Sequence, residues 1–239
     1  MDNPRTNTGE MNKAVKIRRM FDRISARYDL MNRLITFGLD RSWRRLVVTL
    51  AMVPKGGRLL DVGSGTGDIA FEARRRDPSM HIMAADLSPK MMAVGRKRSG
   101  GRRLEWCQAD ALALPFPDGI FDAVTSGYLL RNVSNVSQAL REQMRVVKPG
   151  RRVVCLDTSP PPRHWSRPFV LFYLKWMIPA LGTLVAGDRA AYQYLPNSTQ
   201  AFLEPDRLVA LMREVGFGEV SYRTFMFGTM AVYWGNRGG

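Results

Sequence analysis

The chain has 239 residues, of which 45% are hydrophobic and 24% charged, close to the average of soluble globular proteins. This composition excludes wholesale disorder and fibrous structure, and the length suits a single domain. Thirty-six Lys and Arg residues against 21 Asp and Glu residues give a net charge of +15, which favours an anionic partner: a lipid headgroup surface, a nucleic acid or an acidic metabolite. Two isolated cysteines and two isolated histidines indicate neither a disulfide scaffold nor a metal site.

The N-terminal region divides into a tail and a cap. Residues 1–12 are polar and are predicted to be a disordered tail. They lack the apolar stretch of a secretion signal, so we expect a cytoplasmic protein. Residues 13–51 are predicted to form a helical cap, because apolar residues recur at helical spacing among basic ones: Met20, Ile24, Leu30, Leu34 and Leu46. Residues 13–239 are expected to form one domain that includes this cap.

From residue 58 onward, short apolar runs alternate with helical patterns. Ser88 and Asn135 are predicted helix N-caps, the first followed by a proline and the second in a capping box with Gln138. A further helix is expected at Pro205–Gly216. The alternation predicts an α/β fold with a Rossmann-like, doubly wound, mostly parallel sheet whose last two strands form an antiparallel edge. The seven predicted strands are Arg58–Val62, His81–Ala85, Leu104–Gln108, Phe121–Ser126, Arg152–Asp157, Glu219–Phe225 and Met230–Trp234.

Residues 160–204 interrupt this alternation with an aromatic-rich insertion, which we interpret as a lid over the substrate. Its most apolar window, Phe169–Val185, is shorter than the roughly 20 residues that a membrane-spanning helix needs. The window also contains Lys175 and Pro179. We therefore expect this segment to lie on a membrane and to line the passage of an apolar substrate, rather than to cross the membrane.

The first strand runs directly into a glycine-rich loop, in which alternating glycines let a ligand approach the backbone closely. The spacing G-x-G-x-G places Asp68 where the dinucleotide pattern G-x-G-x-x-G needs its third glycine, which disfavours NAD. The loop also lacks the Gly-Lys-Ser/Thr ending of a P-loop. A ligand with adenosine but no phosphate fits better. The loop and the strand end before it read Leu59-Leu60-Asp61-Val62-Gly63-Ser64-Gly65-Thr66-Gly67-Asp68.

Acidic residues also end the next two predicted strands. Asp86 follows Gly67 by nineteen residues, where a carboxylate can accept both hydrogen bonds of a ribose diol. Asp110 ends the third strand, and its carboxylate can accept from the exocyclic amine of an adenine. Because carboxyl ends of parallel strands share one edge of a sheet, these acids and the glycine loop predict a nucleoside site there.

At this point the sequence resembles the S-adenosylmethionine-dependent methyltransferases of the Rossmann-like class, and within them the ubiquinone/menaquinone biosynthesis C-methyltransferase family. The resemblance covers about residues 15–235, and its N-terminal and Arg-Asn motifs are more specific than the glycine loop. The matching segments are Tyr28-Asp29-Leu30-Met31-Asn32 with Trp43 downstream, Leu130-Arg131-Asn132-Val133, Arg145-Val146-Val147-Lys148-Pro149-Gly150 and Tyr194-Leu195-Pro196-x-Ser198.

The resemblance implies methylation of a ring carbon of a polyprenylated quinol, with demethylmenaquinol as the first choice and a phytylated naphthoquinol or a ubiquinol precursor next. Tyr28 and Arg131 would hold or polarise the quinol oxygens, Arg131 would stabilise phenolate charge, and Asn132 would orient them. The cofactor would be S-adenosylmethionine, and no metal is implied. The residues expected to bind it are Asp61, Gly63, Gly65, Thr66, Gly67, Asp86, Leu87, Asp110, Ala111 and Gly127.

The chain departs from the family pattern at four positions. The family usually has a histidine ahead of Trp43, where this chain has Asp40, and its Glu-x-Ser strand end is Asp157-Thr158-Ser159 here. A small serine near the Arg-Asn motif is replaced by Gly127, and the glycine before Arg131 by leucine. The departures leave the cofactor expectation intact and leave open which quinone is used.

Three other functions compete with this interpretation. A nucleic-acid methyltransferase would suit the positive charge, but the fourth strand ends in Thr125-Ser126-Gly127-Tyr128 without the Asn-Pro-Pro-Tyr type of base-clamping motif. A small-molecule O-methyltransferase is disfavoured by the Tyr-Asp-x-Met-Asn and Arg-Asn segments, and a non-catalytic binding protein by the intact glycine loop. We expect no nucleic-acid partner, a peripheral position on an anionic inner membrane face, and either a monomer or a homodimer.

Overall fold

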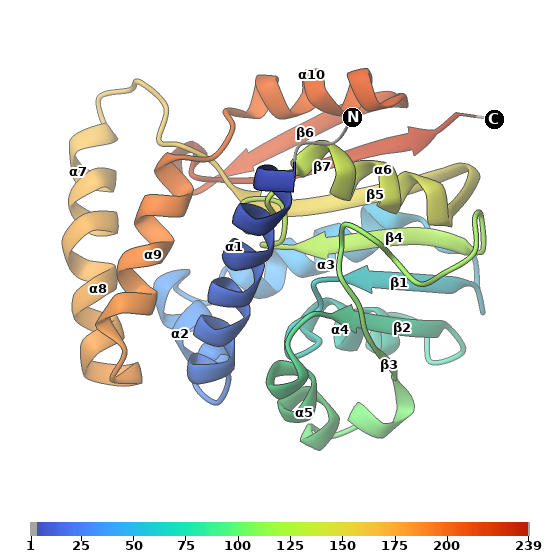
Figure 1. Ribbon diagram of the computed structural model, residues 1–239, viewed down its shortest axis with the longest axis horizontal. Helices are drawn as coiled ribbons and strands as arrows, with labels where there is room; N and C mark the ends of the chain where they lie inside the picture. The colour runs from blue at the N-terminus through green and yellow to red at the C-terminus, as the bar shows by residue number, and fades with distance from the viewer. Residues whose placement is uncertain (1–3, 239) are drawn as a thin grey trace.

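A computed structural model describes residues 4–238, with side chains from residue 13 on, apart from those of residues 186 and 189. Within this part of the chain, seven strands form one sheet in the order β3-β2-β1-β4-β5-β7-β6 (Figure 1). The first five strands are parallel, and β7 is antiparallel to both of its neighbours. The strands are β1 Arg58–Val62, β2 His81–Asp86, β3 Glu105–Gln108, β4 Phe121–Gly127, β5 Val147–Thr158, β6 Phe217–Phe225 and β7 Met230–Arg237.

This sheet confirms the predicted Rossmann-like doubly wound fold with an antiparallel edge. Helices cover both faces, with α3 and α4 on one and α6 and α10 on the other. The helices are α1 Pro4–Ile24, α2 Tyr28–Ile35, α3 Asp40–Ala51, α4 Asp68–Arg76, α5 Pro89–Lys97, α6 Val136–Val146, α7 Arg167–Phe172, α8 Ile178–Leu181, α9 Arg189–Gln200 and α10 Pro205–Val215. The short helical turns are η1 Gly101–Arg103, η2 Tyr173–Met177, η3 Gly182–Ala186 and η4 Met226–Gly228.

Successive side chains of the central strands pack into two separate hydrophobic cores, one on each face of the sheet. In β1, Leu59 packs with the α3 and α4 side, whereas Leu60 packs with the α6 and α10 side. Both are fully buried, as expected when side chains alternate across a parallel sheet that is covered on both faces. The arrows of the parallel strands in Figure 1 point toward α1, α2 and α9, so the cap and the insertion stand at the carboxyl edge.

The cap is helical as predicted, but two details differ. The predicted tail lies partly outside the described residues (1–3), and from Pro4 on the backbone is helical, with a proline whose fixed φ suits the first turn of a helix. The predicted apolar face is wrong at Leu30 and Leu34, which are exposed, whereas Met31 and Ile35 are buried. The turn at residues 25–27 ends α1, so the single helical periodicity assumed for the prediction does not continue into α2. The buried side of α2 therefore carries Met31 and Ile35.

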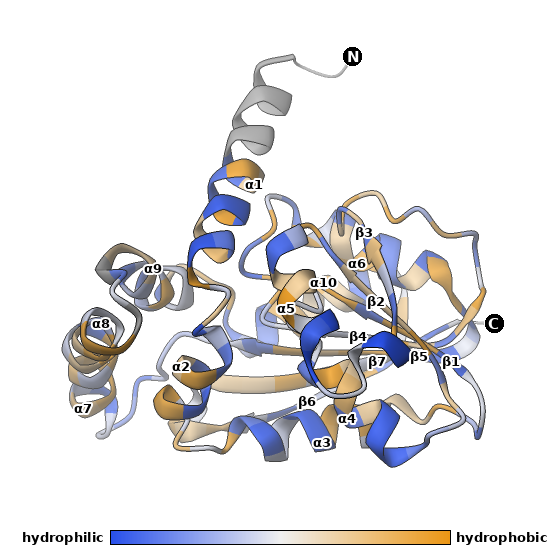
Figure 2. Cartoon of the chain, turned by 90° about the horizontal axis from the view of Figure 1, so that it is seen from below, coloured by the Kyte–Doolittle hydropathy of each residue, from blue (hydrophilic) through white to orange (hydrophobic). Residues whose placement is uncertain are grey.

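The insertion folds into helices at the same edge. A helical stretch, Arg167–Val185, is long and apolar enough by length and composition to cross a membrane, one such stretch in the described part of the chain. The prediction that the segment is too short for this is wrong, because the helix begins two residues before the predicted window at Phe169. It includes π-helical turns at η2 and η3 on either side of α8. Pro179 lies between them, and a proline removes a hydrogen-bond donor and crowds the preceding turn, which a wider turn relieves. Figure 2 colours much of this stretch and of α2 as hydrophobic.

Candidate functional site

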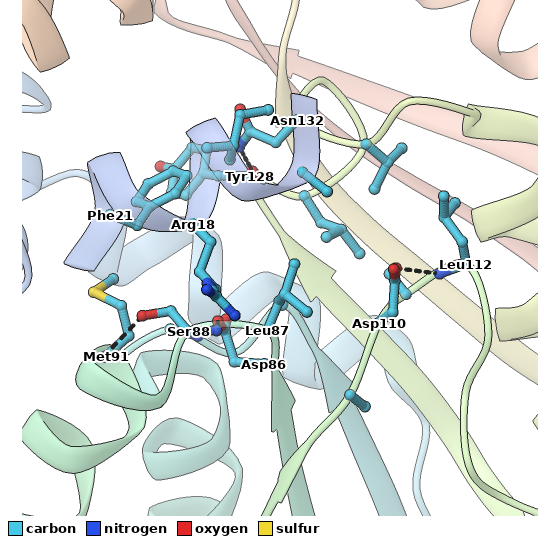
Figure 3. A pocket seen from close by; sticks show the side chains of 18 of the residues that line it. Arg18, Phe21, Asp86, Leu87, Ser88, Met91, Asp110, Leu112, Tyr128 and Asn132 are labelled. Carbon is cyan, nitrogen blue, oxygen red and sulfur yellow. Dashed lines mark hydrogen bonds between the residues drawn. The ribbon is translucent and has the colours of Figure 1, made fainter. Parts of the chain in front are cut away.

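A pocket lies at the carboxyl edge of the sheet, between the glycine loop after β1, the ends of β2 and β4, and α1. The empty space inside it, together with the open solvent at its mouth, amounts to about 820 Å³. Figure 3 shows Asp86 and Asp110 facing this space from one side and Tyr128 and Asn132 from another. The predicted residues that line it are Tyr28, Gly63, Gly65, Asp86, Leu87, Asp110, Ala111, Gly127 and Asn132.

The glycine loop has no room for side chains. Gly63 and Gly65 have φ values of 66° and 56°, a backbone region that other residues rarely adopt. A Cβ atom on Gly63 would stand 2.8 Å from Leu129 Cδ1, and one on Gly127 would stand 2.9 Å from Ile69 Cδ1. The backbone of the loop therefore forms part of the pocket wall itself, which suits close approach of a ligand.

Asp86 holds the loop and the next helix together. One carboxylate oxygen accepts from the Gly65 N–H at 2.7 Å, and the other accepts from the Ser88 N–H at 2.7 Å. Burial raises the pKa of Asp86, and these two backbone donors oppose that rise. Since each carboxylate oxygen has two lone pairs, Asp86 keeps two acceptor sites for a ligand diol. Asp110 is similarly oriented by the Leu112 N–H at 2.9 Å.

Three residues expected at the cofactor do not line this pocket. Asp61 and Thr66 line a smaller cavity that adjoins it, since Tyr28, Gly63, Gly65, Gly127 and Tyr128 line both. A Cβ atom on Gly67, just before α4, would stand 2.8 Å from the Trp106 ring. Asp61 is buried, and one of its oxygens accepts from Thr125 Oγ1 at 3.0 Å. The other oxygen has no partner within the described chain, and burial raises the pKa of Asp61 to about 7. Spacing alone does not distinguish the residues that line the pocket from those that line the adjoining cavity.

The predicted catalytic residues come from different elements. Tyr28 in α2 and Asn132 in the loop after β4 line the pocket. Arg131 is buried behind this wall, where its Nη1 pairs with Asp157 Oδ1 at 2.5 Å. The Arg131 guanidinium lies 5.1 Å from the centre of the Tyr128 ring. Burial raises the pKa of Tyr28, and the positive charge of Arg131 opposes that rise, so Arg131 acts electrostatically on the tyrosine hydroxyl.

Tyr128 is a site residue that the sequence reasoning missed. It follows Gly127 at the end of β4 with a φ of 58°, strain that tends to occur at functional sites. Its hydroxyl and the Nε of Arg131 are buried without a hydrogen-bond partner among the described residues. A buried polar group left in this state costs about 1–3 kcal/mol. At the Tyr128 hydroxyl the pocket therefore presents an unfilled hydrogen-bonding position beside Tyr28.

The Tyr-Leu-Pro motif of the insertion supports the same site. Tyr194 in α9 donates through its hydroxyl to Asn132 Oδ1 at 3.0 Å, and Asn132 Nδ2 donates to the Tyr128 carbonyl at 2.6 Å. These two bonds fix the amide orientation of Asn132 and connect the insertion to the end of β4. In the sequence, the motif is the only indication of this contact, and a motif does not tell which distant residue its side chains reach.

Helix α1 forms the roof of the pocket. Asp22 accepts from Ser88 Oγ at 2.5 Å, and Lys13 donates to the Val133 carbonyl at 2.8 Å. These contacts fasten the helix to both sides of the opening. Between them Arg18 extends from α1 toward Asp86 (Figure 3). The helical cap therefore closes over the site.

A chain of charges joins the cap to the glycine loop. Asp29 in α2 accepts from Thr66 Oγ1 at 2.5 Å and lies 3.3 Å from Arg98 Nη1. Asp68, at the start of α4, pairs with Arg98 at 2.6 Å and with Arg44 at 2.7 Å. Asp40, which stands where the related family has a histidine, pairs in turn with Arg44 inside the cap. The departure at residue 40 thus belongs to the packing of the cap.

Comparison with known proteins identifies the chain's relatives. The model of the ubiE/COQ5 methyltransferase family matches residues 9–237. The chain belongs to this family. A ubiquinone/menaquinone biosynthesis C-methyltransferase UbiE from Desulfotalea psychrophila is 46% identical over 225 residues, 94% of this chain and 92% of that protein. A demethylmenaquinone methyltransferase from Thermus thermophilus is 44% identical over 220 residues, 91% of this chain and 100% of that protein. The family resemblance predicted from the motifs is confirmed.

Solved structures place the ubiE/COQ5 chain in a wider fold class. A SAM-dependent methyltransferase from Thermotoga maritima has a TM-score of 0.64 at 18% identity, covering 92% of this chain and 99% of that one. Phosphoethanolamine N-methyltransferase 2 of Haemonchus contortus, in complex with S-adenosyl-L-methionine, has a TM-score of 0.61 at 14% identity, covering 82% and 52%. At these identities the likeness concerns the fold, which confirms the predicted class.

Proposed function

We propose that this protein transfers a methyl group from S-adenosylmethionine to a ring carbon of a polyprenylated quinol, converting demethylmenaquinol to menaquinol at the cytoplasmic side of a membrane. The observation that carries the proposal is the match of 44% identity to a demethylmenaquinone methyltransferase across that protein's whole length. The confirmed family and the pocket at the sheet edge agree with it.

The pocket residues fit the cofactor. Gly63 and Gly65 line the pocket with bare backbone, and Asp86 retains acceptor sites for a ribose diol. Asp110, Leu87 and Ala111 line the part of the pocket where the adenine would lie. When bound, S-adenosylmethionine supplies a methyl group that its sulfonium makes electrophilic. The protein therefore needs to bind and align the two reactants, which is the largest contribution to such a transfer.

The quinol end of the site is formed by Tyr28 and Tyr128, with the charge of Arg131 buried behind them. A quinol oxygen that bonds with the unpartnered Tyr128 hydroxyl removes the cost of leaving that group buried alone. Loss of a phenolic proton raises electron density on the ring carbon, and the positive charge of Arg131 stabilises the resulting phenolate. Asp157 holds Arg131 in place, while Tyr194 fixes the orientation of Asn132. Carbon methylation then ends with loss of the ring C–H proton.

The proposal is tested by supplying purified protein and methyl-labelled S-adenosylmethionine with demethylmenaquinol, a phytylated naphthoquinol, a ubiquinol precursor or tRNA in separate reactions. We expect label on the demethylmenaquinol ring. Preferred labelling of another quinol changes the substrate within the same class. Label on tRNA alone overturns the quinol proposal and makes the basic surface a nucleic-acid site.

The role of Arg131 is tested by Arg131→Ala. Because the guanidinium acts on charge that develops during the reaction, we expect turnover to fall by at least about a hundredfold while binding of S-adenosylhomocysteine changes little. Equal losses of turnover and cofactor affinity would show that Arg131 serves the fold alone. Circular dichroism and thermal melting of the variant check that it remains folded.

A further inference from the structure

Large aromatic side chains of the insertion and of the turn after α2 are exposed to solvent. They form what we call the apolar face, and their exposed fractions run from 59% at Phe172 to 73% at Trp165. The members are Phe37, Trp165, Phe169, Phe172 and Trp176. Exposed apolar groups of this size are normal when scattered, but a cluster of them marks an interaction site.

The apolar face is continuous across two segments of the chain. The ring of Phe37, in the turn between α2 and α3, lies 5.8 Å from the ring of Tyr173 in η2. The Tyr173 hydroxyl donates to the Ile35 carbonyl at 2.7 Å. The helical cap and the insertion therefore present this face together, although 130 or so residues separate them in sequence.

The helical stretch Arg167–Val185 is apolar on two sides. Leu174 and Ile178 are buried against α1, α2 and α9. Phe169, Phe172 and Trp176 follow the spacing of one helix face and point outward. A helix that is hydrophobic all round needs an apolar environment on both sides. The protein supplies one of these environments, and something outside the chain supplies the other.

Charge indicates what the second environment is. Residues 159–187 contain no Asp or Glu, and their three cationic residues, Arg163, Arg167 and Lys175, are exposed. In the part of the chain that the structure describes, these three make no salt bridge. Tryptophans beside lysines and arginines are typical of the bilayer interface, whereas lysine is depleted at protein interfaces.

We propose that the apolar face inserts into the headgroup region of an anionic lipid bilayer and holds the protein there with the helical stretch parallel to the membrane. The consequence of this proposal rests on the proposed function. An apolar cluster that contains Tyr173, the ring partner of Phe37, and Tyr28 runs from the helical stretch to the quinol end of the pocket. A quinol head with an apolar tail then moves between lipid and pocket along this cluster without crossing water.

Flotation of the full chain tests the proposal directly. The vesicles are phosphatidylcholine alone and phosphatidylcholine with about one third phosphatidylglycerol. Wild-type protein should float with the anionic vesicles and much less with the neutral ones. Failure to float with either, or a dimer in light scattering that buries the face and persists with vesicles present, overturns the proposal.

Two variants separate insertion from charge attraction. Phe169→Ser with Trp176→Ser should lower partitioning to both vesicle types, whereas Met52→Ser, an exposed apolar residue at the end of α3 that leads into the start of β1, should not. Changing Arg163, Arg167 and Lys175 to Gln should lower the partition coefficient on anionic vesicles about a hundredfold. An equal charge change at Lys55, Arg58 and Arg151, which lie at or near the starts of β1 and β5, should have little effect. Equal losses in test and control variants contradict the proposal.

Turnover measurements distinguish two outcomes: that the apolar face does not bind membranes, or that the proposed function is wrong. The double serine variant should methylate a short-tailed, water-soluble demethylmenaquinol at the wild-type rate, which also shows that it is folded. It should lose most of its activity on long-tailed demethylmenaquinol in anionic vesicles. If wild-type protein methylates neither substrate, the proposed function fails, while flotation still decides the membrane surface. Equal activity of the variant and the wild type on the substrate in vesicles overturns the proposal that the apolar face binds the membrane.

Discussion

The pair between Arg131 and Asp157 offers a sharp test of how the site is held together. Asp157 is fully buried and accepts from Arg131 Nη1 at 2.5 Å, from the Arg131 N–H at 3.2 Å and from the Thr158 N–H at 2.8 Å. Asp157→Asn removes the charge and turns one acceptor into a donor, which leaves the Arg131 guanidinium buried and poorly paired. We expect the free energy of unfolding to fall by about 3–5 kcal/mol.

A second aspartate provides the matched control. Asp118 pairs with Arg145 at 2.7 Å, but its side chain is 69% exposed, and Arg145 also bonds to Glu142. Asp118→Asn should therefore change the free energy of unfolding by no more than about 1 kcal/mol. Urea unfolding followed by circular dichroism measures both variants in one buffer. Similar losses for the two would refute the argument from burial, as would an Asp157→Asn variant as stable as wild type.

Three further predictions concern the pocket. Gly63→Ala should weaken S-adenosylhomocysteine binding at least about tenfold in calorimetry because its Cβ meets Leu129, whereas Gly119→Ala, with a similar positive φ and no neighbour closer than 3.8 Å, should not. Burial raises the pKa of Asp61 to about 7 in the folded protein. As the pH rises from about 4 to about 7, the free energy of unfolding of the wild type should therefore fall relative to that of Asp61→Asn, by up to about 4 kcal/mol in urea titrations. A pH-independent difference would contradict this. Tyr128→Phe should lower turnover more than cofactor affinity in paired kinetic and binding measurements, and unchanged kinetics would exclude its hydroxyl from the site.

The sheet was predictable because its signals are local. The β1 strand has the predicted bounds, and the Ser88 and Asn135 caps both form, with the Met91 and Gln138 N–H groups as donors. The Asn135 capping box is incomplete, because the Gln138 side chain donates to the Leu112 carbonyl instead. That bond joins residues 26 positions apart, and such long-range competition is not visible in a local pattern.

The site was predictable only in part for the same reason. Spacing identified Asp86 and the glycines, because strand ends and tight turns are sequence-local features. It did not reveal that Asp61 lines the smaller adjoining cavity, that Arg131 pairs with Asp157, or that Tyr128 presents an unpartnered hydroxyl. These facts depend on how distant segments pack, so they follow from the fold and not from a motif.

The position of the transferred methyl group tests the central claim most directly. Purified protein, S-adenosylmethionine with a ¹³C-labelled methyl group and demethylmenaquinol are incubated, and the product is analysed by NMR. Our account predicts a labelled methyl bonded to a ring carbon, with both phenolic oxygens unmethylated, because in the proposed function Tyr28 and Tyr128 would bind the oxygens and the charge of Arg131 would stabilise phenolate. A labelled methyl on oxygen, or an unlabelled quinol alongside protein that binds the cofactor, would contradict it.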